Sequence, residues 1–280
     1  MTNKLQTLLD QFSAEAQTFS GRFGLAAQAV DSDTPILFQA EEVFPTASVI
    51  KLAVVAEYLA QVEAGHLSPV ELITLDAADQ VGGAGVLLDL QPGLTLTLQD
   101  LARLAITISD NTASNLLLKA VGGLAPVNAR LASLGMHQTT LGRRFIFDSP
   151  ADNTGSPADF LTFLLALARG QVVSPTASRQ LLAMMQRQQY TTYIPRYLPF
   201  HPFAAEYGLP QEVTVANKVG MLPGVVNDAA LLTTPTGRYA LVIFSRDCAD
   251  YRPDPDNEGA LLVARLAKVV YDYFGGDYGR

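Results

Sequence analysis

Hydrophobic residues recur at helical spacing at the start of the chain, and the spacing then changes to that of strands. Leu5, Leu8, Leu9 and Phe12 fall on one helical face, which predicts an amphipathic helix over about the first 18 residues. Residues 23–30 and 35–39 are short apolar segments separated by a polar cluster at residues 31–34, a pattern typical of a hairpin. The N-terminal part is therefore predicted to be one helix followed by two paired strands.

The middle of the chain is dominated by helical patterns. Residues 47–64 are good helix formers with a broad apolar face, and Gly65 ends the segment, so that Ser48 falls in the first helical turn. Further helices are predicted at residues 98–108, 112–121, 126–133, 157–168 and 176–188. Residues 190–210 are rich in Tyr, Phe and Pro without periodicity, which indicates a long connection packed by its own aromatic rings.

Strand patterns return near the end, at residues 213–219, 228–233 and 239–244, and a last helix is predicted at residues 257–274. Because strands occur only near the two chain ends, we predict an α+β fold. Its sheet has about five mostly antiparallel strands, with the terminal helices on one face and the inserted helices as a second lobe. The predicted division is a sheet domain of residues 1–46 and 212–280 and an all-helical domain of residues 47–211, with the active site in the cleft between them.

Composition narrows the classes of partner. The 280 residues are 49% hydrophobic, enough to bury a substantial core, and carry a formal net charge of −8. A nucleic-acid surface needs clustered Lys and Arg, so no nucleic-acid partner is expected. The single cysteine, Cys248, cannot form an intramolecular disulfide, so nothing in the sequence depends on an oxidising compartment.

The first residues lack the basic start and apolar run of a secretory signal, and no later stretch approaches the roughly 20 apolar residues that cross a bilayer. We therefore expect a cytoplasmic protein with no membrane partner. A chain trimmed of its leader would instead be periplasmic or secreted. A monomer is favoured, although the sequence leaves the oligomeric state open.

The first candidate for chemistry is Ser48-Val49-Ile50-Lys51. A serine hydroxyl needs a neighbouring base to become a nucleophile, and a lysine three residues on along a helix lies on the same face. Unpaired N–H groups at the start of the helix would favour an oxyanion. Taken alone, the pair is better explained as a serine at a helix start with Lys51 extended to solvent.

Two further motifs follow along the chain. Ser109-Asp110-Asn111 precedes an apolar helix, so it is either a helix N-cap or a source of a proton-relaying hydroxyl and a substrate-binding amide, with Asp110 bracing the loop. Lys218-Val219-Gly220 ends a predicted strand. It is either an edge lysine before a turn glycine or a cation and strand edge beside the nucleophile, with Met221 adding a backbone N–H.

Together, the three motifs have the order and approximate spacing of S-x-x-K, S-D-N and K-T-G, the motif set of serine β-lactamases and penicillin-binding proteins. The chain resembles the class A group of this superfamily over nearly its whole length. The resemblance implies a β-lactamase/transpeptidase-like fold in which Ser48 is acylated, Lys51 takes its proton and Ser109 relays a proton. It also implies substrate binding by Asn111, Lys218, Val219 and Gly220, and an oxyanion hole formed by the N–H groups of Ser48 and Met221.

The sequence departs from the class A pattern at two places. Class A enzymes carry a glutamate in the loop between the second and third motifs, within a segment like E-P-E-L-N, whereas residues 141–153 here contain none. The possible loop carboxylates are Asp148 and Asp152, and pairing with Arg143 or Arg144 is favoured over catalysis. Val219 replaces the threonine of K-T-G and therefore lacks its hydroxyl.

We therefore expect a serine hydrolase that is acylated by a β-lactam or related small acyl compound and releases the acyl group slowly. The alternatives are an esterase or D-amino-acid peptidase using the same site, and a non-catalytic binding protein that has kept the cleft. No metal or cofactor is expected, because His66, His137 and His201 have no metal-ligand spacing and no phosphate-binding glycine motif occurs.

Overall fold

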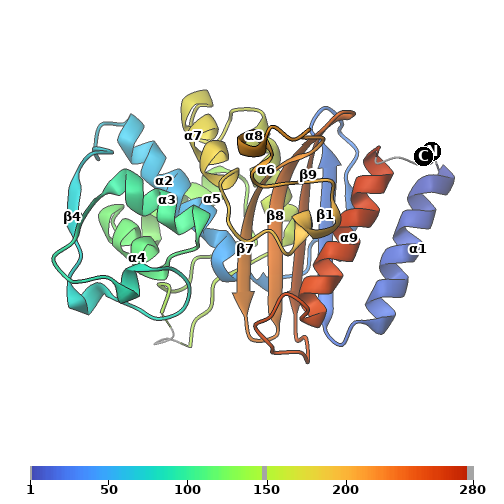
Figure 1. Ribbon diagram of the computed structural model, residues 1–280, viewed down its shortest axis with the longest axis horizontal. Helices are drawn as coiled ribbons and strands as arrows, with labels where there is room; N and C mark the ends of the chain where they lie inside the picture. Colours follow the sequence, from blue (N-terminus) through green and yellow to red (C-terminus); the bar gives the residue numbers. More distant parts are fainter. Residues whose placement is uncertain (1, 147–149, 276–280) are drawn as a thin grey trace.

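The computed structural model describes residues 2–146 and 150–275. Its centre is a five-stranded antiparallel sheet in the order β2-β1-β9-β8-β7 (Figure 1). The strands are β1 (Arg22–Ala29), β2 (Ile36–Phe38), β7 (Thr214–Leu222), β8 (Val225–Thr234) and β9 (Gly237–Arg246). Both chain ends therefore contribute strands to one sheet, and the predicted fold class is confirmed. The three late strands are longer than their apolar patterns indicated.

The two terminal helices cover one face of the sheet. Helices α1 (Thr2–Thr18) and α9 (Glu258–Phe274) lie side by side on this face (Figure 1). The side chains of Leu8 and Phe12 are buried, and Asn257 caps α9 by accepting the N–H groups of Gly259 and Ala260. The helical spacing of leucines near the start of the chain thus predicted this helix and its buried face.

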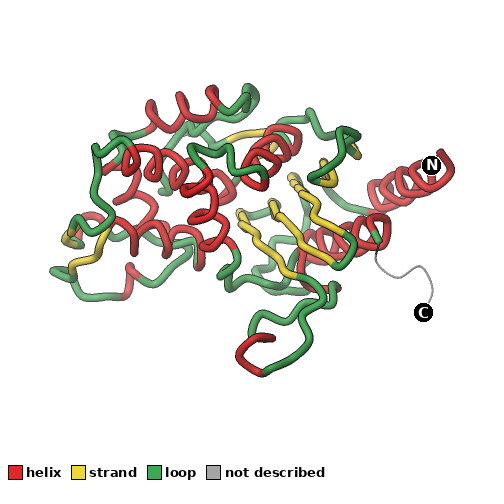
Figure 2. The backbone as a smooth tube through the Cα atoms, turned by 90° about the horizontal axis from the view of Figure 1, so that it is seen from above, coloured by secondary structure: helices red, strands yellow, loops and turns green. Residues whose placement is uncertain are grey.

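The inserted segment supplies the helices on the other side, so the sheet lies between two helical layers (Figures 1 and 2). Capping residues fix several helix starts: the side chains of Thr97, Asp110, Ser156 and Ser174 each accept an N–H from the first turn that follows. The inserted helices are α2 (Lys51–Glu63), α3 (Leu98–Thr107), α4 (Asn111–Ala120), α5 (Leu124–Ser133), α6 (Pro157–Ala168) and α7 (Pro175–Met185).

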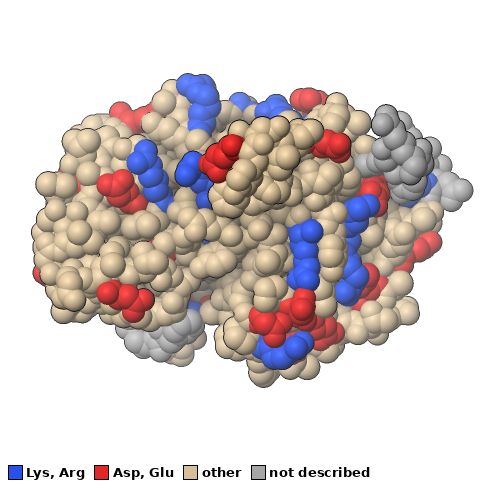
Figure 3. Space-filling model, in the orientation of Figure 1, with Lys and Arg blue, Asp and Glu red and all other residues tan. Residues whose placement is uncertain are grey.

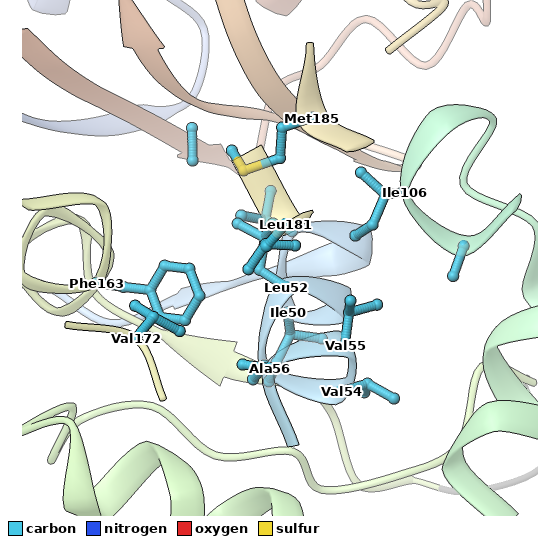
Figure 4. Close-up of a cluster of buried hydrophobic side chains, with 14 of the residues drawn as sticks. Ile50, Leu52, Val54, Val55, Ala56, Ile106, Phe163, Val172, Leu181 and Met185 are labelled. Carbon is cyan, nitrogen blue, oxygen red and sulfur yellow. The ribbon is translucent and has the colours of Figure 1, made fainter. Parts of the chain in front are cut away.

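Helix α2 lies at the centre of the inserted helices. Every residue from Lys51 to Leu59 is buried, and apolar side chains from α3, α6 and α7 surround its first turns (Figure 4). Leu52 and Val55, for example, lie among Ile106, Phe163 and Leu181 (Figure 4). Close packing of this kind holds the segment that begins at Ser48 in one position.

Short elements complete the chain. The 3₁₀ turns are η1 (Ala47–Ile50), η2 (Ala77–Asp79), η3 (Leu87–Asp89) and η4 (Ile194–Tyr197), and a single helical turn forms α8 (Ala204–Tyr207). Two small ladders pair β3 (Phe44–Pro45) with β6 (Thr154–Gly155) and β4 (Leu72–Thr74) with β5 (Thr95–Thr97). The predicted long connection between the last inserted helix and β7 thus contains η4 and α8.

One inserted helix packs directly on the sheet. Phe160 of α6 contacts Phe244 of β9 edge to face, with ring centroids 5.1 Å apart. Both belong to one apolar cluster that also contains the core of α2. A second cluster fills the space between the sheet and the terminal helices. The division into a sheet domain and an all-helical domain remains a prediction.

On the face shown in Figure 3, Lys and Arg side chains are scattered among Asp and Glu and do not gather in one patch, outside the grey atoms. Within the described ranges, no helix is both long and apolar enough to span a bilayer.

Candidate active site

Ser48 lies in the 3₁₀ turn η1, directly before α2, and its side chain is partly exposed. The prediction that it occupies the first turn of the α-helix is therefore wrong by one turn. Ala47 has a φ of 48°, an uncommon value for a residue with a Cβ, and this reverses the backbone before Ser48. The next two residues, Val49 and Ile50, are fully buried and anchor the turn.

Lys51 is completely buried, and its amine points to the 109–111 segment. Its Nζ donates to the backbone oxygen of Ser109 at 2.5 Å, to Ser109 Oγ at 3.2 Å and to Asn111 Oδ1 at 2.7 Å. Among the described residues, no hydrogen bond joins Lys51 to the Ser48 hydroxyl. The expectation that helical spacing alone would join them is not met, because three acceptors of the neighbouring loop hold the amine.

A second buried lysine meets the same hydroxyl from the sheet. Lys218 of β7 donates from Nζ to Ser109 Oγ at 3.0 Å and to the backbone oxygen of Val219 at 2.7 Å. Burial lowers the pKa of Lys218 to about 7, although the Asp228 carboxyl opposes the shift. Ser109 Oγ therefore lies between two lysine amines from different elements.

The pKa of Lys51 is held well below its ordinary value, first by burial and then by the charge of Lys218, while Asp110 acts in the opposite direction. A lowered pKa favours the neutral amine, which is the form of Lys51 that can accept a proton. The charge of Lys218 thus acts on the amine of Lys51 across Ser109.

The 109–111 segment combines the two roles that its sequence left open. Asp110 caps α4 through the N–H of Ala113, and its other oxygen accepts the N–H groups of Val86 and Leu87. Ser109 has a φ of 58°, a strained conformation that directs the segment toward the lysines. Asp110 therefore braces the loop, as predicted, while Ser109 and Asn111 face the site.

A glycine-rich stretch fits closely against this segment. A Cβ on Gly83 would lie 2.4 Å from Asn111 Nδ2, and one on Gly85 would lie 2.2 Å from Asp110 Oδ2. Asn111 also donates from Nδ2 to the backbone oxygen of Gly82 at 3.0 Å. The cluster of glycines at residues 82–85 is a sequence signal of this close backbone approach, although it belongs to none of the three motifs.

The register of β7 and β8 determines which way the backbone N–H of Met221 points. Because Leu222 and Val225 close a two-residue turn, Met221 occupies a non-hydrogen-bonded position of the ladder, and its N–H points away from β8. Gly220 lets β7 approach η1, since a Cβ there would lie 2.9 Å from the Ser48 nitrogen. The Ser48 and Met221 N–H groups are therefore available to the predicted oxyanion hole.

Ser48 opens onto two cavities. One of about 400 Å³ is lined by Ser48, Ser109, Val219, Met221 and residues 189–193, and a smaller one of about 100 Å³ is lined by Ser48, Asn111, Phe145 and Asp152. The motif residues thus converge on a two-sided cleft. Lys51 and Lys218 are not among the lining residues of either cavity, because they are buried behind Ser109.

The loop that departs from the class A pattern forms the wall of the smaller cavity. Asp152 pairs with Arg143 at 3.3 Å, as expected for a carboxylate that braces the loop. Asn153 accepts the N–H groups of Gly142 and Arg143 on its side chain, and its backbone oxygen accepts the N–H of Thr46 at 2.8 Å. The loop is thereby tied to the stretch that precedes Ser48. Asp148 lies outside the described residues.

Phe145 is a site residue that the sequence did not reveal. Lys51 Nζ lies 4.8 Å from the centre of its ring, and Asn115 accepts the Phe145 N–H at 2.8 Å. An aromatic ring therefore covers Lys51 from the loop side. No periodicity or motif marks a single phenylalanine in a loop, so no sequence signal could have identified it.

Asp228 was also missed. It is fully buried in β8, and its carboxylate accepts hydrogen bonds from Asn217 Nδ2 and from the N–H of Ile194. Burial raises the pKa of Asp228 to about 7, although these hydrogen bonds and the charge of Lys218 act to lower it. Its N–H partner Ile194 follows Tyr193, which lines the larger cavity. The sequence signal for this buried acid is a carboxylate within an apolar strand pattern.

Within the described part of the chain, no group of three His, Cys, Asp or Glu side chains is placed to hold a metal ion.

Comparison with known proteins connects this geometry to a family. Residues 2–274 match the Beta-lactamase enzyme family. β-Lactamase AST-1 of Nocardia asteroides is 31% identical over 272 residues, covering 94% of this chain and 82% of that protein. A β-lactamase of Streptomyces albus G is 29% identical over 264 residues, covering 91% of this chain and 80% of the relative.

Solved structures agree. A β-lactamase from Sphaerobacter thermophilus superposes with a TM-score of 0.85 at 32% identity, covering 96% of this chain and 97% of that chain. A PBP-A variant captured as its acyl-enzyme complex with penicillin G has a TM-score of 0.82 at 29% identity, covering 98% of this chain and 97% of that chain. The chain belongs to the β-lactamase enzyme family, as a distant homologue of the class A β-lactamases and of PBP-A.

Proposed function

We propose that this protein is a serine hydrolase that β-lactams acylate through Ser48 and that releases the acyl group slowly. The observation that carries the proposal is the continuous set of hydrogen bonds from Asn111 through Lys51 and Ser109 to Lys218, at the closed side of a cleft that Ser48 lines. A site kept only for its shape would not need two buried lysines on one hydroxyl.

In the proposed acylation, Ser48 Oγ attacks the lactam carbonyl and its proton passes to the neutral amine of Lys51. The carbonyl oxygen becomes negative and is stabilised by the N–H groups of Ser48 and Met221. The C–N bond then breaks, and Ser109 relays a proton to the leaving nitrogen. In this step Lys51 exchanges a bond to Ser109 for one to Ser48.

The slow release of the acyl group is explained by the loop that departs from the class A pattern. Hydrolysis of the acyl-enzyme needs a group that activates water, and no described carboxylate forms a hydrogen bond or an ion pair with Ser48 or Lys51. Asp152 is paired with Arg143, and the ring of Phe145 covers Lys51. We therefore expect the covalent adduct to accumulate.

The test is intact-mass spectrometry after incubation with penicillin G. We expect an added mass equal to the intact drug, which persists after excess drug is removed and is absent in Ser48→Ala. A folded protein with neither adduct nor drug hydrolysis would refute the proposal. Reversible binding that survives in Ser48→Ala would instead support a non-catalytic binding protein.

The second candidate is an esterase or D-amino-acid peptidase with the same acylation step. It is favoured by the larger cavity, whose lining includes the hydroxyl groups of Thr191, Thr192 and Tyr193. Cleavage of p-nitrophenyl esters without lactam acylation would support it.

A further inference from the structure

Asp228 is a buried carboxylate to which the proposed acylation gives no role. It alternates along β8 with Val226 and Ala230, which belong to the apolar cluster between the sheet and the terminal helices. Its side chain therefore lies on that face of the sheet. Burying a carboxylate among apolar side chains costs free energy unless hydrogen bonds compensate, so its donors show which segments it holds together.

One of these donors belongs to the 3₁₀ turn η4. The N–H of Ile194 donates to Asp228 Oδ2 at 3.1 Å, and Asn217 Nδ2 of β7 donates to both carboxylate oxygens at 3.1 Å. Ile194 is itself fully buried, and η4 packs on α9. The carboxylate of Asp228 thus fixes η4 to the last two strands at this edge of the sheet.

One wall of the larger cavity leads directly into η4. Residues 189–193 line this cavity, and Tyr193 is the residue that precedes Ile194. Tyr193 is buried in the same apolar cluster, and its hydroxyl contacts the sulfur of Met221, which also lines the cavity. A displacement of Ile194 from the sheet would therefore move this wall.

A second part of the lining is also tied to η4. Arg196 donates to the backbone oxygen of Pro255 and pairs with the Asp256 carboxylate at 2.6 Å. Pro253 and Pro255 line the larger cavity. Two segments of the lining that are far apart in the chain thus meet at η4.

We propose that Asp228 is a positioning residue for the active site, which holds η4 in place and thereby sets the shape of the larger cavity. The inference rests on the proposed acylation of Ser48, because the cavity is occupied by the compound that Ser48 attacks. Asp228 does not line the cavity and touches no reacting group. Its contact with Ile194 should therefore affect the noncovalent complex more than the bond-forming step.

The test measures Ser48 acylation by penicillin G, followed by intact mass at increasing drug concentration. The concentration dependence gives the dissociation constant of the noncovalent complex and, separately, the rate constant of bond formation. Asp228→Val has a similar size but no acceptor for the Ile194 N–H. It should raise the dissociation constant about tenfold, because the drug must then order a wall that the protein no longer holds.

Asp228→Asn is the matched variant, because it keeps an acceptor oxygen for the Ile194 N–H. The charge of Asp228 also acts to raise the pKa of Lys218, and both variants remove that charge. Any effect of the charge on bond formation should therefore be common to the two variants. The dissociation constant should stay near the wild-type value in Asp228→Asn and rise only in Asp228→Val.

Two more variants test the path through η4. Arg196→Ala frees residues 253–256 from the turn and should also raise the dissociation constant. Combined with Asp228→Val, its effect should be smaller than the product of the single effects, because both act through η4. Glu57→Leu is the control. It removes another buried carboxylate, which pairs with Arg130 at 3.0 Å and lies outside the lining of the cavity, so the dissociation constant should not change.

Equal dissociation constants in folded Asp228→Val and Asp228→Asn would overturn this inference and leave the proposed acylation intact. If circular dichroism shows that Asp228→Val does not fold, Arg196→Ala decides, and a wild-type dissociation constant in that variant overturns the inference. Failure of penicillin G to modify the wild-type protein would instead remove the proposed function, and this inference with it.

Discussion

At the scale of single residues, the most consequential contact is the one between Phe145 and Lys51. The ring covers the amine at 4.8 Å from the loop in which class A enzymes carry a carboxylate. Phe145→Glu would bring a carboxylate toward Lys51 and Ser48, where it could activate water. We expect release of the penicilloyl group to accelerate about a hundredfold, the lower range for a general base.

The decay of the adduct, followed by intact mass, measures this release. Phe145→Gln is the matched control, because it has the same length and polarity without a basic oxygen. Equal decay in the two variants would show that loss of the ring, not a new base, changes the rate.

The charge of Lys218 is the other residue-scale determinant. Below its pKa, Lys51 is protonated and cannot take the Ser48 proton, so the acylation rate must fall on the acid side. Because Lys218 lowers the pKa of Lys51, Lys218→Met should raise that pKa and move the acid limb to higher pH. The pH profile of the acylation rate measures the shift, and a fixed limb with only a reduced maximum would contradict it.

At the scale of elements, the site depends on how closely β7 approaches η1. A Cβ on Gly220 would lie 2.7 Å from the Thr46 oxygen and 2.9 Å from the Ser48 nitrogen. Gly220→Ala should therefore push the strand from the turn and separate the two oxyanion donors. We expect acylation to slow by about 10²-fold, as when one such donor is lost.

Acylation rates and the unfolding temperature should be measured together for Gly220→Ala. The expected outcome is slow acylation in a protein that is still folded, since the change is confined to the contact between β7 and η1. Acylation at the wild-type rate would mean that the strand and the turn can separate without loss of the oxyanion hole.

Predicting elements from the sequence succeeded where the pattern was local and failed at the contacts between elements. The apolar face from Leu5 to Phe12 identified α1, and Asp110 marked the start of α4. The sequence predicts α-helix where the structure has a 3₁₀ turn at Ser48. Apolar spacing does not show that the backbone changes direction at Ala47, where η1 meets β7. The motifs named residues that lie close together in the structure, whereas no motif predicted the contact of Lys51 with Ser109.

At the scale of the whole molecule, one apolar cluster joins the inserted helices to the sheet through Phe160 and Phe244. Phe244→Ala should lower the free energy of unfolding by about 3–5 kcal/mol, the usual cost of removing a buried aromatic ring. Because the cluster crosses the predicted domain boundary, we expect a single unfolding transition for both parts of the protein.

Urea unfolding followed by far-ultraviolet circular dichroism and by tyrosine fluorescence provides the measurement. Coincident transitions would indicate one cooperative unit. Two separated transitions in the variant, with the helices persisting after the sheet is lost, would support independent domains and contradict this expectation.

The sequence by itself determined the order of the elements, the fold class and the three motifs that the fold brings together, because hydrophobic spacing, capping residues and short motifs are local signals. Only the tertiary structure decided how those residues interact. It directs Lys51 to Ser109 and Asn111, brings Lys218 to the Ser109 hydroxyl and covers Lys51 with Phe145. These are contacts between segments far apart in the chain, and burial among them shifts the pKa values on which the chemistry depends.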